Sequence, residues 1–296
     1  MTKDPHEILK SFEPTKEFFI GIDSDGCAFD SMEIKHKECF CPNFINHLEL
    51  QKVSKYARET WDFVNLYSKT RGCNRFLAIK KALDLLRKRK EVIARNADIM
   101  KTTALEEWIS KESKLGNPSL EEYLKDNDIP DLHKLLNWSL AVNETIADMV
   151  YGIPPFPYMR ESLVKLFDKA DAMVVSQTPV EALIREWEEN DIIKYVHLIA
   201  GQEFGTKSEH LALGAKGKYP DNKILMIGDA LGDMKAAKIN GGLFYPINPG
   251  NEEASWQRFC EEGLDKFFSG EFEGDYEKNL IEEFNNHLPE NPSWDH

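Results

Sequence analysis

Short apolar runs alternate with helical patterns over much of the chain. Phe18–Ile22 is an apolar run that ends at a cluster of Asp, Ser and Gly, which predicts a buried strand stopping at a loop. Similar runs predict further strands at Ala172–Val175, Val196–Ala200, Ile224–Ile227 and Leu243–Ile247. Between these four lie helical patterns at Val180–Glu189, Ser208–Ala215 and Met234–Ile239. This alternation predicts βαβ units, and hence a parallel sheet with helices on both faces.

The long stretch between the first and second predicted strands has almost no strand signal. Its apolar spacing is helical in four segments: Phe76–Leu86, Ala104–Ile109, Leu120–Leu124 and Leu132–Val150. The proline-rich segment Gly152–Pro157 predicts a stiff connection back to the sheet. We therefore expect an α/β, Rossmann-like core from residues 1–31 and 158–296, and an inserted all-helical domain from residues 32–157. Two more helical patterns, Glu252–Phe268 and Tyr276–Phe284, lie in an acidic C-terminal region.

Charge and cysteine content narrow the class of protein. The net charge of -14 argues against a nucleic-acid partner, because such proteins need a basic face. Residues 32–157 hold 20 Lys+Arg against 18 Asp+Glu, so the inserted domain is the less acidic part. The five cysteines suggest neither a disulfide framework nor a zinc site. No stretch has the length of a membrane span, which predicts a cytoplasmic protein without a membrane partner.

The polar residues that follow the predicted strands are candidates for chemistry, because ligands bind at the carboxyl ends of a parallel sheet. The first strand is followed by Asp23-Ser24-Asp25-Gly26, the second by Ser176-Gln177-Thr178, and the fourth by Asp229 and Asp233. Lys207 follows the third strand. Four converging carboxylates would repel one another without a cation, and an oxygen-only ligand set suits Mg²⁺.

These residues resemble, in the same order, the four motifs of the haloacid dehalogenase (HAD) superfamily over residues 17–250. The insertion after the first motif resembles the helical C1 cap of that superfamily. The resemblance implies Asp23 as a nucleophile that becomes an aspartyl-phosphate, and Asp25 as the general acid and base. It also implies phosphate binding by Ser176, Gln177 and Lys207, and metal binding by Asp23, Asp25, Asp229 and Asp233. Cys27 and the residue after Lys207 depart from the usual pattern.

Each of these residues also has an ordinary structural interpretation. Asp23 and Asp25 could form a solvated turn, Ser176 could be a helix N-cap, and Asp233 could be an acid in a first helical turn. Lys216, Lys218 and Lys223 are rivals of Lys207, but they lie too close to Asp229 to leave room for a helix and a strand. The ordered set of motifs favours the functional interpretation.

The expected function is Mg²⁺-dependent hydrolysis of a small phosphorylated metabolite. Asp25 favours phosphate esters, because dehalogenases of the superfamily generally lack an acid there. A phosphomutase and a non-catalytic binding protein are the alternatives. The basic cap segment that includes Lys69, Arg71 and Arg75 is the expected specificity loop, or else a solvated connector. The run Arg87–Lys90 is expected to be the exposed end of a helix.

Overall fold

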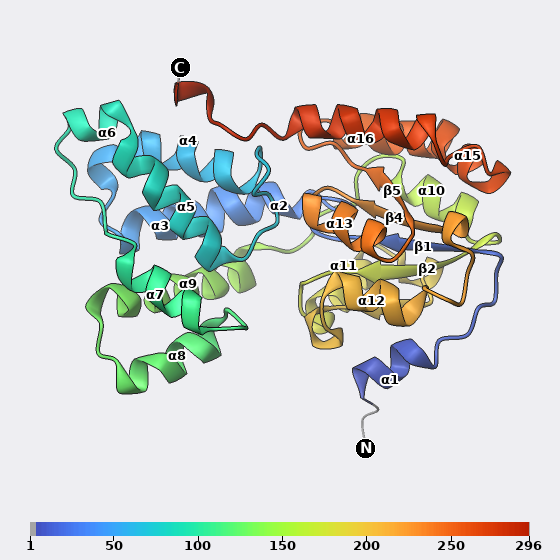
Figure 1. Ribbon diagram of the computed structural model, residues 1–296, viewed down its shortest axis with the longest axis horizontal. Helices are drawn as coiled ribbons and strands as arrows, with labels where there is room; N and C mark the ends of the chain where they lie inside the picture. The colour runs from blue at the N-terminus through green and yellow to red at the C-terminus, as the bar shows by residue number, and fades with distance from the viewer. Residues whose placement is uncertain (1–3, 296) are drawn as a thin grey trace. The chain divides into compact units, whose positions relative to one another are not determined.

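The computed structural model describes residues 4–295, which form two compact units (Figure 1). The sheet unit comprises the chain up to Ser31 and then Tyr151–Leu288, and the helical unit comprises Met32–Val150 and the segment from Pro289 onward. Two segments therefore lie in a different unit from the one in which the sequence analysis placed them. Residues 151–157 belong to the sheet unit, and the C-terminal segment belongs to the helical unit.

The sheet unit is built on one parallel sheet of five strands within the described residues. The strands are β1 (Phe18–Ile22), β2 (Ala170–Val175), β3 (Leu198–Ala200), β4 (Ile224–Gly228) and β5 (Leu243–Pro246). Their order is β3-β2-β1-β4-β5, so β1 has β2 on one side and β4 on the other. Ile22 is in register with both Val174 and Ile227, so the carboxyl ends of these three strands meet at one edge. A reversal of strand order of this kind is where α/β sheets bind ligands.

Helices cover both faces of the sheet, which explains why the strands read as continuous apolar runs. The side chains of Phe18, Ile20 and Ile22 pack on one face, and Phe19 packs on the other. The first face is covered by α10 (Met159–Leu166), α11 (Val180–Glu189), α14 (Glu252–Arg258) and α15 (Leu264–Ser269). The second face is covered by α1 (Pro5–Lys10), α12 (Lys207–Gly214) and α13 (Leu231–Ile239). The last helix of this unit, α16 (Asp275–His287), contributes to both apolar clusters.

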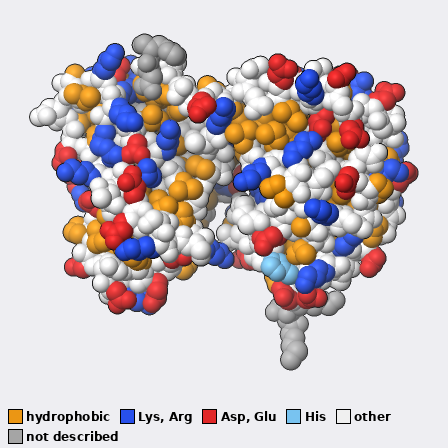
Figure 2. All heavy atoms as spheres, in the orientation of Figure 1, with side chains coloured by type: hydrophobic (Ala, Val, Ile, Leu, Met, Phe, Trp, Pro, Cys, Tyr) orange, Lys and Arg blue, Asp and Glu red, His pale blue; other side chains and the backbone are white. Residues whose placement is uncertain are grey.

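The helical unit has its own apolar core. Its helices are α3 (Cys41–His47), α4 (Ser54–Asn65), α5 (Arg75–Lys88), α6 (Lys90–Ala94), α7 (Thr103–Lys111), α8 (Asn117–Asp126) and α9 (Pro130–Met149). The short α2 (Ser31–Ile34) leads into this unit through a π-helical turn, Lys35–Phe40. Aromatic rings dominate the core: the Trp61 ring lies 6.0 Å from Phe40 and 5.8 Å from Trp138. Figure 2 shows Lys and Arg interspersed with Asp and Glu over the visible face of this unit.

The structure confirms that Lys88 and Lys90 in the run Arg87–Lys90 are exposed, but it corrects that expectation for Arg89. Arg89 is only 5% exposed, and its guanidinium lies between the Tyr56 and Trp294 rings, at 4.6 and 4.3 Å from their centroids. It also forms ion pairs with Glu59 and Glu91. Arginine can be buried in this way because its flat guanidinium stacks on aromatic rings.

The segment after Leu288 holds this arginine in place and is anchored on the helical unit. The Trp294 ring packs edge-on against Phe63, with ring centres 5.5 Å apart, and also contacts Arg89. Lys69 binds the same segment twice: its amide donates to the Pro289 carbonyl, and its ammonium pairs with Glu290 at 3.2 Å. Among residues 4–295, no helix has the length and apolar character needed to cross a bilayer.

Candidate active site

Asp23 lies immediately after β1 and is 4% exposed. Its backbone amide donates to the Ile227 carbonyl of β4 at 3.0 Å, which extends the sheet pairing by one residue. The carboxylate has two different partners. Its Oδ1 accepts the Ser24 amide at 2.8 Å, and its Oδ2 lies 2.7 Å from the Lys207 ammonium. Contacts at both carboxylate oxygens therefore fix the orientation of the Asp23 side chain.

Asp229 and Asp233 follow β4, the neighbour of β1 in the sheet, and are 2% and 0% exposed. Asp233 lies in the first turn of α13, and its Oδ2 accepts the Ala230 amide at 3.0 Å. Gly228 makes this arrangement possible, because a Cβ there would lie 2.3 Å from the Cβ of Asp233. The helix can begin this close to the strand only because Gly228 has no side chain.

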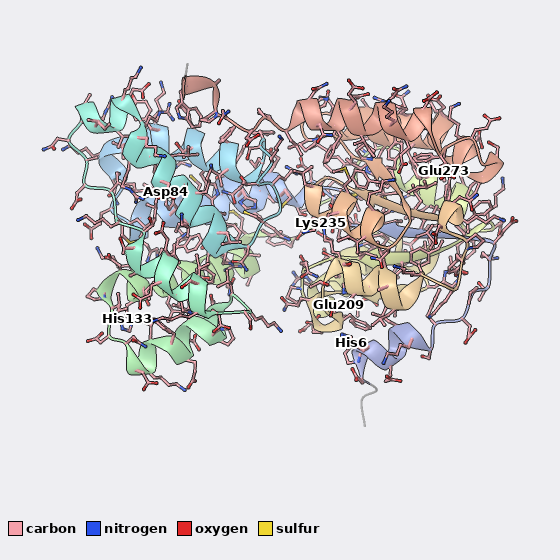
Figure 3. The ribbon with its side chains drawn as sticks, in the orientation of Figure 1. His6, Asp84, His133, Glu209, Lys235 and Glu273 are labelled. Carbon is pink, nitrogen blue, oxygen red and sulfur yellow. The ribbon has the colours of Figure 1, made fainter. Side chains whose placement is uncertain are left out.

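Lys207 is the first residue of α12, and a capping box fixes where that helix begins. The Thr206 hydroxyl accepts the Glu209 amide, and the Glu209 carboxylate accepts the Thr206 amide. Figure 3 labels Glu209 in this turn. The Lys207 ammonium then reaches Asp233 at 2.6 Å as well as Asp23.

The three rival lysines are engaged elsewhere. Lys216 donates to the Ile239 carbonyl, Lys218 to three carbonyls that include those of Leu9 and Phe12, and Lys223 pairs with Glu17. Of these four lysines, Lys207 is the one whose described contacts include Asp23 and Asp233.

The electrostatics of this cluster are unbalanced. One oxygen from each of Asp23, Asp229 and Asp233 lies within 4.8 Å of the others, against the single charge of Lys207. Burial raises the pKa of Asp23 well above its usual value; Lys207 opposes this rise, and the two neighbouring aspartates add to it. Burial likewise raises the pKa of Asp233. Burial disfavours the charged form of Lys207, but Asp23 and Asp233 outweigh it and raise its pKa.

This donor set fits a divalent cation. The cluster offers three buried carboxylates at one point, with no sulfur or imidazole ligand in the group. Hard oxygen ligands of this kind suit Mg²⁺, and a divalent charge would balance the formal excess of two negative charges. Asp25 is not a member of this three-carboxylate group, although the sequence analysis counted it among the metal ligands.

Asp25 is instead held by two hydroxyl groups. Ser31, at the start of α2, donates to its Oδ1, and Thr178 donates to its Oδ2 at 2.7 Å. Gly26, the next residue, has a φ of 74° and turns the loop so that its amide donates to the Phe29 carbonyl. The sequence analysis assigned no role to Ser31 or Thr178. The available signal was that Thr178 directly follows Gln177, whereas Ser31 lies six residues after Asp25.

Ser176 and Gln177 follow β2 at this edge but differ in their surroundings. Ser176 is 2% exposed; its amide donates to the Ala200 carbonyl, and its hydroxyl accepts the Thr178 amide at 3.2 Å. Gln177 is exposed, and its side-chain amide donates to the Gly205 carbonyl at 2.9 Å. Among the described contacts, Gln177 therefore stabilises the neighbouring loop through its side chain.

The basic segment of the helical unit contains three different environments. Lys69 pairs with Glu290, and Arg71 is buried, with its Nη1 donating to the Leu66 carbonyl at 2.9 Å. Arg75 begins α5 and forms no ion pair with a carboxylate among the described residues. Its Nη1 contacts Ser139 and Asn143 on α9, and its guanidinium carbon lies 5.0 Å from the centre of the Phe40 ring. Burial lowers the pKa of Arg75 to about 10.

Comparison with known proteins identifies the fold. No protein-family model matches the chain, and no curated protein matches it either. Among solved structures, it is similar to a haloacid dehalogenase-like family hydrolase from Streptococcus pneumoniae, with a TM-score of 0.52 at 12% identity; the match covers 86% of this chain and 100% of that one. A HAD-superfamily hydrolase of subfamily IA from Geobacter sulfurreducens is also similar, with a TM-score of 0.40 at 14% identity; the match covers 79% of this chain and 89% of that one. A predicted phosphoglycolate phosphatase from Haemophilus somnus has a TM-score of 0.45 at 14% identity, and the match covers 79% of this chain and 86% of that one. The chain therefore has a HAD-like α/β fold, as its motifs suggested.

Proposed function

We propose that this protein is a Mg²⁺-dependent phosphatase that hydrolyses a small phosphomonoester through an aspartyl-phosphate on Asp23. The observation that carries the proposal is the excess of buried carboxylates over cations at the carboxyl edge of the sheet. Asp23, Asp229 and Asp233 would hold the ion. When bound, Mg²⁺ would neutralise negative charge on the transferring phosphoryl group.

Asp23, Asp25, Ser176 and Lys207 have distinct roles in the proposed reaction. Asp23 attacks phosphorus, a P–O bond to Asp23 forms, and the bond to the leaving oxygen breaks. Asp25 gives its proton to that oxygen, and then takes a proton from the water that attacks the aspartyl-phosphate and regenerates the Asp23 carboxylate. Ser176 and Lys207 hold the phosphoryl oxygens. Asp25 must exchange its bonds with Ser31 and Thr178 for these partners during the cycle.

We further propose that the helical unit acts as a cap that recognises the rest of the substrate, with Arg75 as its anion-binding residue. Lys69 and Arg71 are already engaged by Glu290 and by a backbone carbonyl. The Arg75 guanidinium is oriented by α9 and by the Phe40 ring, and no described carboxylate neutralises it. An oriented, uncompensated guanidinium is suited to an anionic substrate group.

The direct test is a screen of phosphorylated metabolites for release of inorganic phosphate, with purified protein and MgCl₂. Asp23→Asn, prepared in parallel, controls for contaminating phosphatases. Phosphate release by wild type but not by the variant supports the proposal. An isomeric sugar phosphate without free phosphate would identify a phosphomutase instead. Absence of turnover on every ester would favour a non-catalytic binding protein.

A further inference from the structure

Ser24 lies between the two motif aspartates, yet its side chain takes part in a buried network on the α11 side of the loop. Ser24 is fully buried. Its hydroxyl accepts the indole N–H of Trp187 at 3.0 Å and donates to the Glu186 carboxylate at 3.0 Å. Both partners are on α11, more than 160 positions along the chain.

The backbone of Ser24 links this network to the candidate nucleophile. Its amide donates to Asp23 Oδ1 at 2.8 Å, and its carbonyl accepts the amides of Ala28 and Phe29. The same residue is therefore held by α11 through its side chain and orients Asp23 through its peptide group. A shift of the hydroxyl would move the peptide, since the two are separated by only a few bonds.

The same helix is also connected to Asp25. Thr178, which donates to the Asp25 carboxylate, lies two residues before the start of α11. Trp187, near the other end of α11, is fully buried and packs edge-on against Phe29, with ring centres 5.8 Å apart. Polar groups buried this completely are costly unless they are hydrogen-bonded, so the Ser24 hydroxyl has a strong preference for this one arrangement.

We propose that Trp187 and Glu186 are positioning residues, which act through Ser24 to hold the peptide N–H that orients Asp23. The inference concerns how the site is assembled, and its catalytic consequence rests on the proposed function. Neither side chain needs to touch the substrate. Their effect falls on the rate of attack rather than on phosphate binding, because Ser176 and Lys207 make none of these contacts.

The first experiment measures the network without relying on catalysis. Amide and indole hydrogen exchange are followed by NMR in the full ¹⁵N-labelled chain, as wild type, Ser24→Ala, Trp187→Phe and Trp108→Phe. We expect Ser24→Ala to speed exchange of the Trp187 indole, and Trp187→Phe to speed exchange of the Ser24 amide, each by at least about tenfold. Trp108→Phe is the matched control, since Trp108 is equally buried and its Nε1 finds no partner among the described residues. Unchanged exchange at the Ser24 amide in Trp187→Phe would overturn the proposal.

The second experiment measures the catalytic consequence with p-nitrophenyl phosphate. Ser24→Ala and Trp187→Phe should lower kcat by about 10- to 100-fold, the scale expected for a small misplacement of a reacting group. The KM and the inhibition constant of inorganic phosphate should stay within about threefold of wild type. Glu186→Gln, which keeps an oxygen acceptor for Ser24, should retain more activity than Glu186→Leu. Wild-type kcat in Ser24→Ala would contradict the proposal, whereas an inactive wild type with coupled exchange would contradict only the proposed function.

Discussion

Each unit of the protein contains an aspartate in contact with a lysine, and the pKa values of the two aspartates are displaced in opposite directions. In the helical unit, burial favours the neutral form of Asp84, but the hydrogen bond and charge of Lys80 outweigh it and lower the pKa. In the sheet unit, Asp233 contacts Lys207 at 2.6 Å, yet its pKa is raised. The difference lies in burial and in the charges around each pair.

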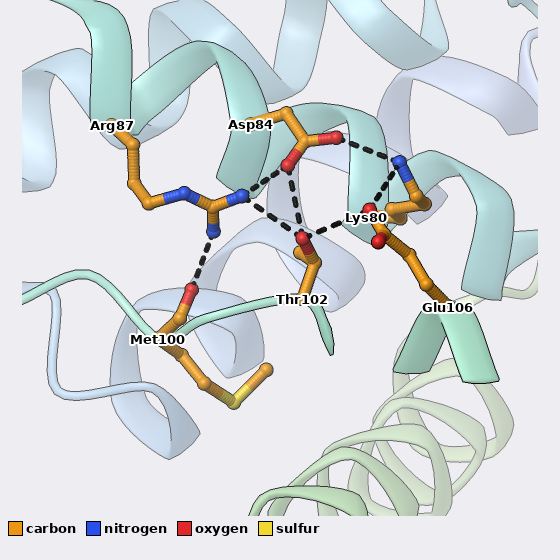
Figure 4. Close-up of polar contacts among 6 residues, drawn as sticks. All are labelled: Lys80, Asp84, Arg87, Met100, Thr102 and Glu106. Atoms are coloured by element: carbon orange, nitrogen blue, oxygen red, sulfur yellow. Dashed lines mark hydrogen bonds and ion pairs between the residues drawn. The ribbon is translucent and has the colours of Figure 1, made fainter. Parts of the chain in front are cut away.

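Figure 4 shows the helical-unit cluster, in which acids and bases are balanced. Lys80 bridges Asp84 and Glu106, both at 2.9 Å, and Arg87 contacts Asp84 and the Thr102 hydroxyl. Two cations face two anions, and the Asp84 side chain is 26% exposed. Such clusters stabilise a surface modestly.

In the sheet-unit cluster three buried acids face one base, whose side chain is 18% exposed. A buried excess of one charge costs stability, and the proposed Mg²⁺ would offset it.

The largest expected difference between the two clusters is in catalysis. Asp23→Asn should lower turnover of p-nitrophenyl phosphate by at least about 10³-fold, because an amide keeps the shape of the side chain but cannot attack phosphorus. Asp84→Asn should leave this activity within about twofold of wild type and lower stability by about 0.5–1 kcal/mol. Initial rates and thermal unfolding of both variants measure the contrast. Residual activity within tenfold of wild type in Asp23→Asn would refute its role as nucleophile.

Removal of metal tests the charge imbalance directly. EDTA should abolish phosphatase activity, and MgCl₂ should restore it and raise Tm, because the ion binds only the folded cluster. Asp229→Ala should weaken Mg²⁺ binding more than Asp233→Ala, since Lys207 already compensates part of the Asp233 charge. Magnesium titrations of both variants check the order. Full activity of chelator-treated, metal-free protein would exclude the metal site.

Substitutions at two arginines separate recognition from stability in the helical unit. Arg75→Ala should lower kcat/KM for the best physiological substrate by about 10- to 150-fold, the value of a lost charge-assisted contact, with a much smaller effect on p-nitrophenyl phosphate. Arg71→Ala should mainly lower Tm, because Arg71 is buried and bonded to the Leu66 carbonyl. The comparison requires steady-state kinetics on both substrates. Equal losses on both in Arg75→Ala would indicate damaged folding instead.

The last expected effect concerns the dependence of stability on pH, to which the two units contribute differently. His210 is fully buried in α12, and burial, with a contribution from the Lys207 charge, lowers its pKa to about 4. Between about pH 6.5 and 4, His210 is therefore protonated in the unfolded chain but neutral in the folded chain. This contribution to stability is present above about pH 6.5 and is lost as the pH falls toward 4, by up to ~3 kcal/mol.

His210→Leu should flatten this part of the pH profile, as measured by urea unfolding between pH 7 and 4.5. His133→Gln is the control in the helical unit (His133 is labelled in Figure 3), because this histidine is 46% exposed on α9 and pairs with Asp128. The slope of the His133→Gln profile should match that of wild type. A wild-type slope in His210→Leu would show that another group causes the loss.

Local patterns predicted the sheet and its edge well. The predicted bounds of Val180–Glu189 and Phe18–Ile22 match the structure. The helix shows a helical periodicity because one face is buried, and the strand is a continuous apolar run because both faces are buried. The carboxyl-edge residues were predicted because parallel topology brings strand ends together. Arg89, Trp294 and the partners of Ser24 could not be predicted in this way. Their environments depend on contacts between distant segments, and the sequence near each residue carries no signal of its partner.

The anchoring of the C-terminal segment has a consequence for modularity. The helical unit is formed by two separate pieces of chain, Met32–Val150 and the segment from Pro289 onward. Trp294 on the second piece packs against Phe63 and Arg89 on the first. If only the first piece were replaced by the helical domain of another protein, the Trp294 indole would lose its contacts with both Phe63 and Arg89. The transplantable module is therefore discontinuous, and a chimaera has to take both pieces from the same parent.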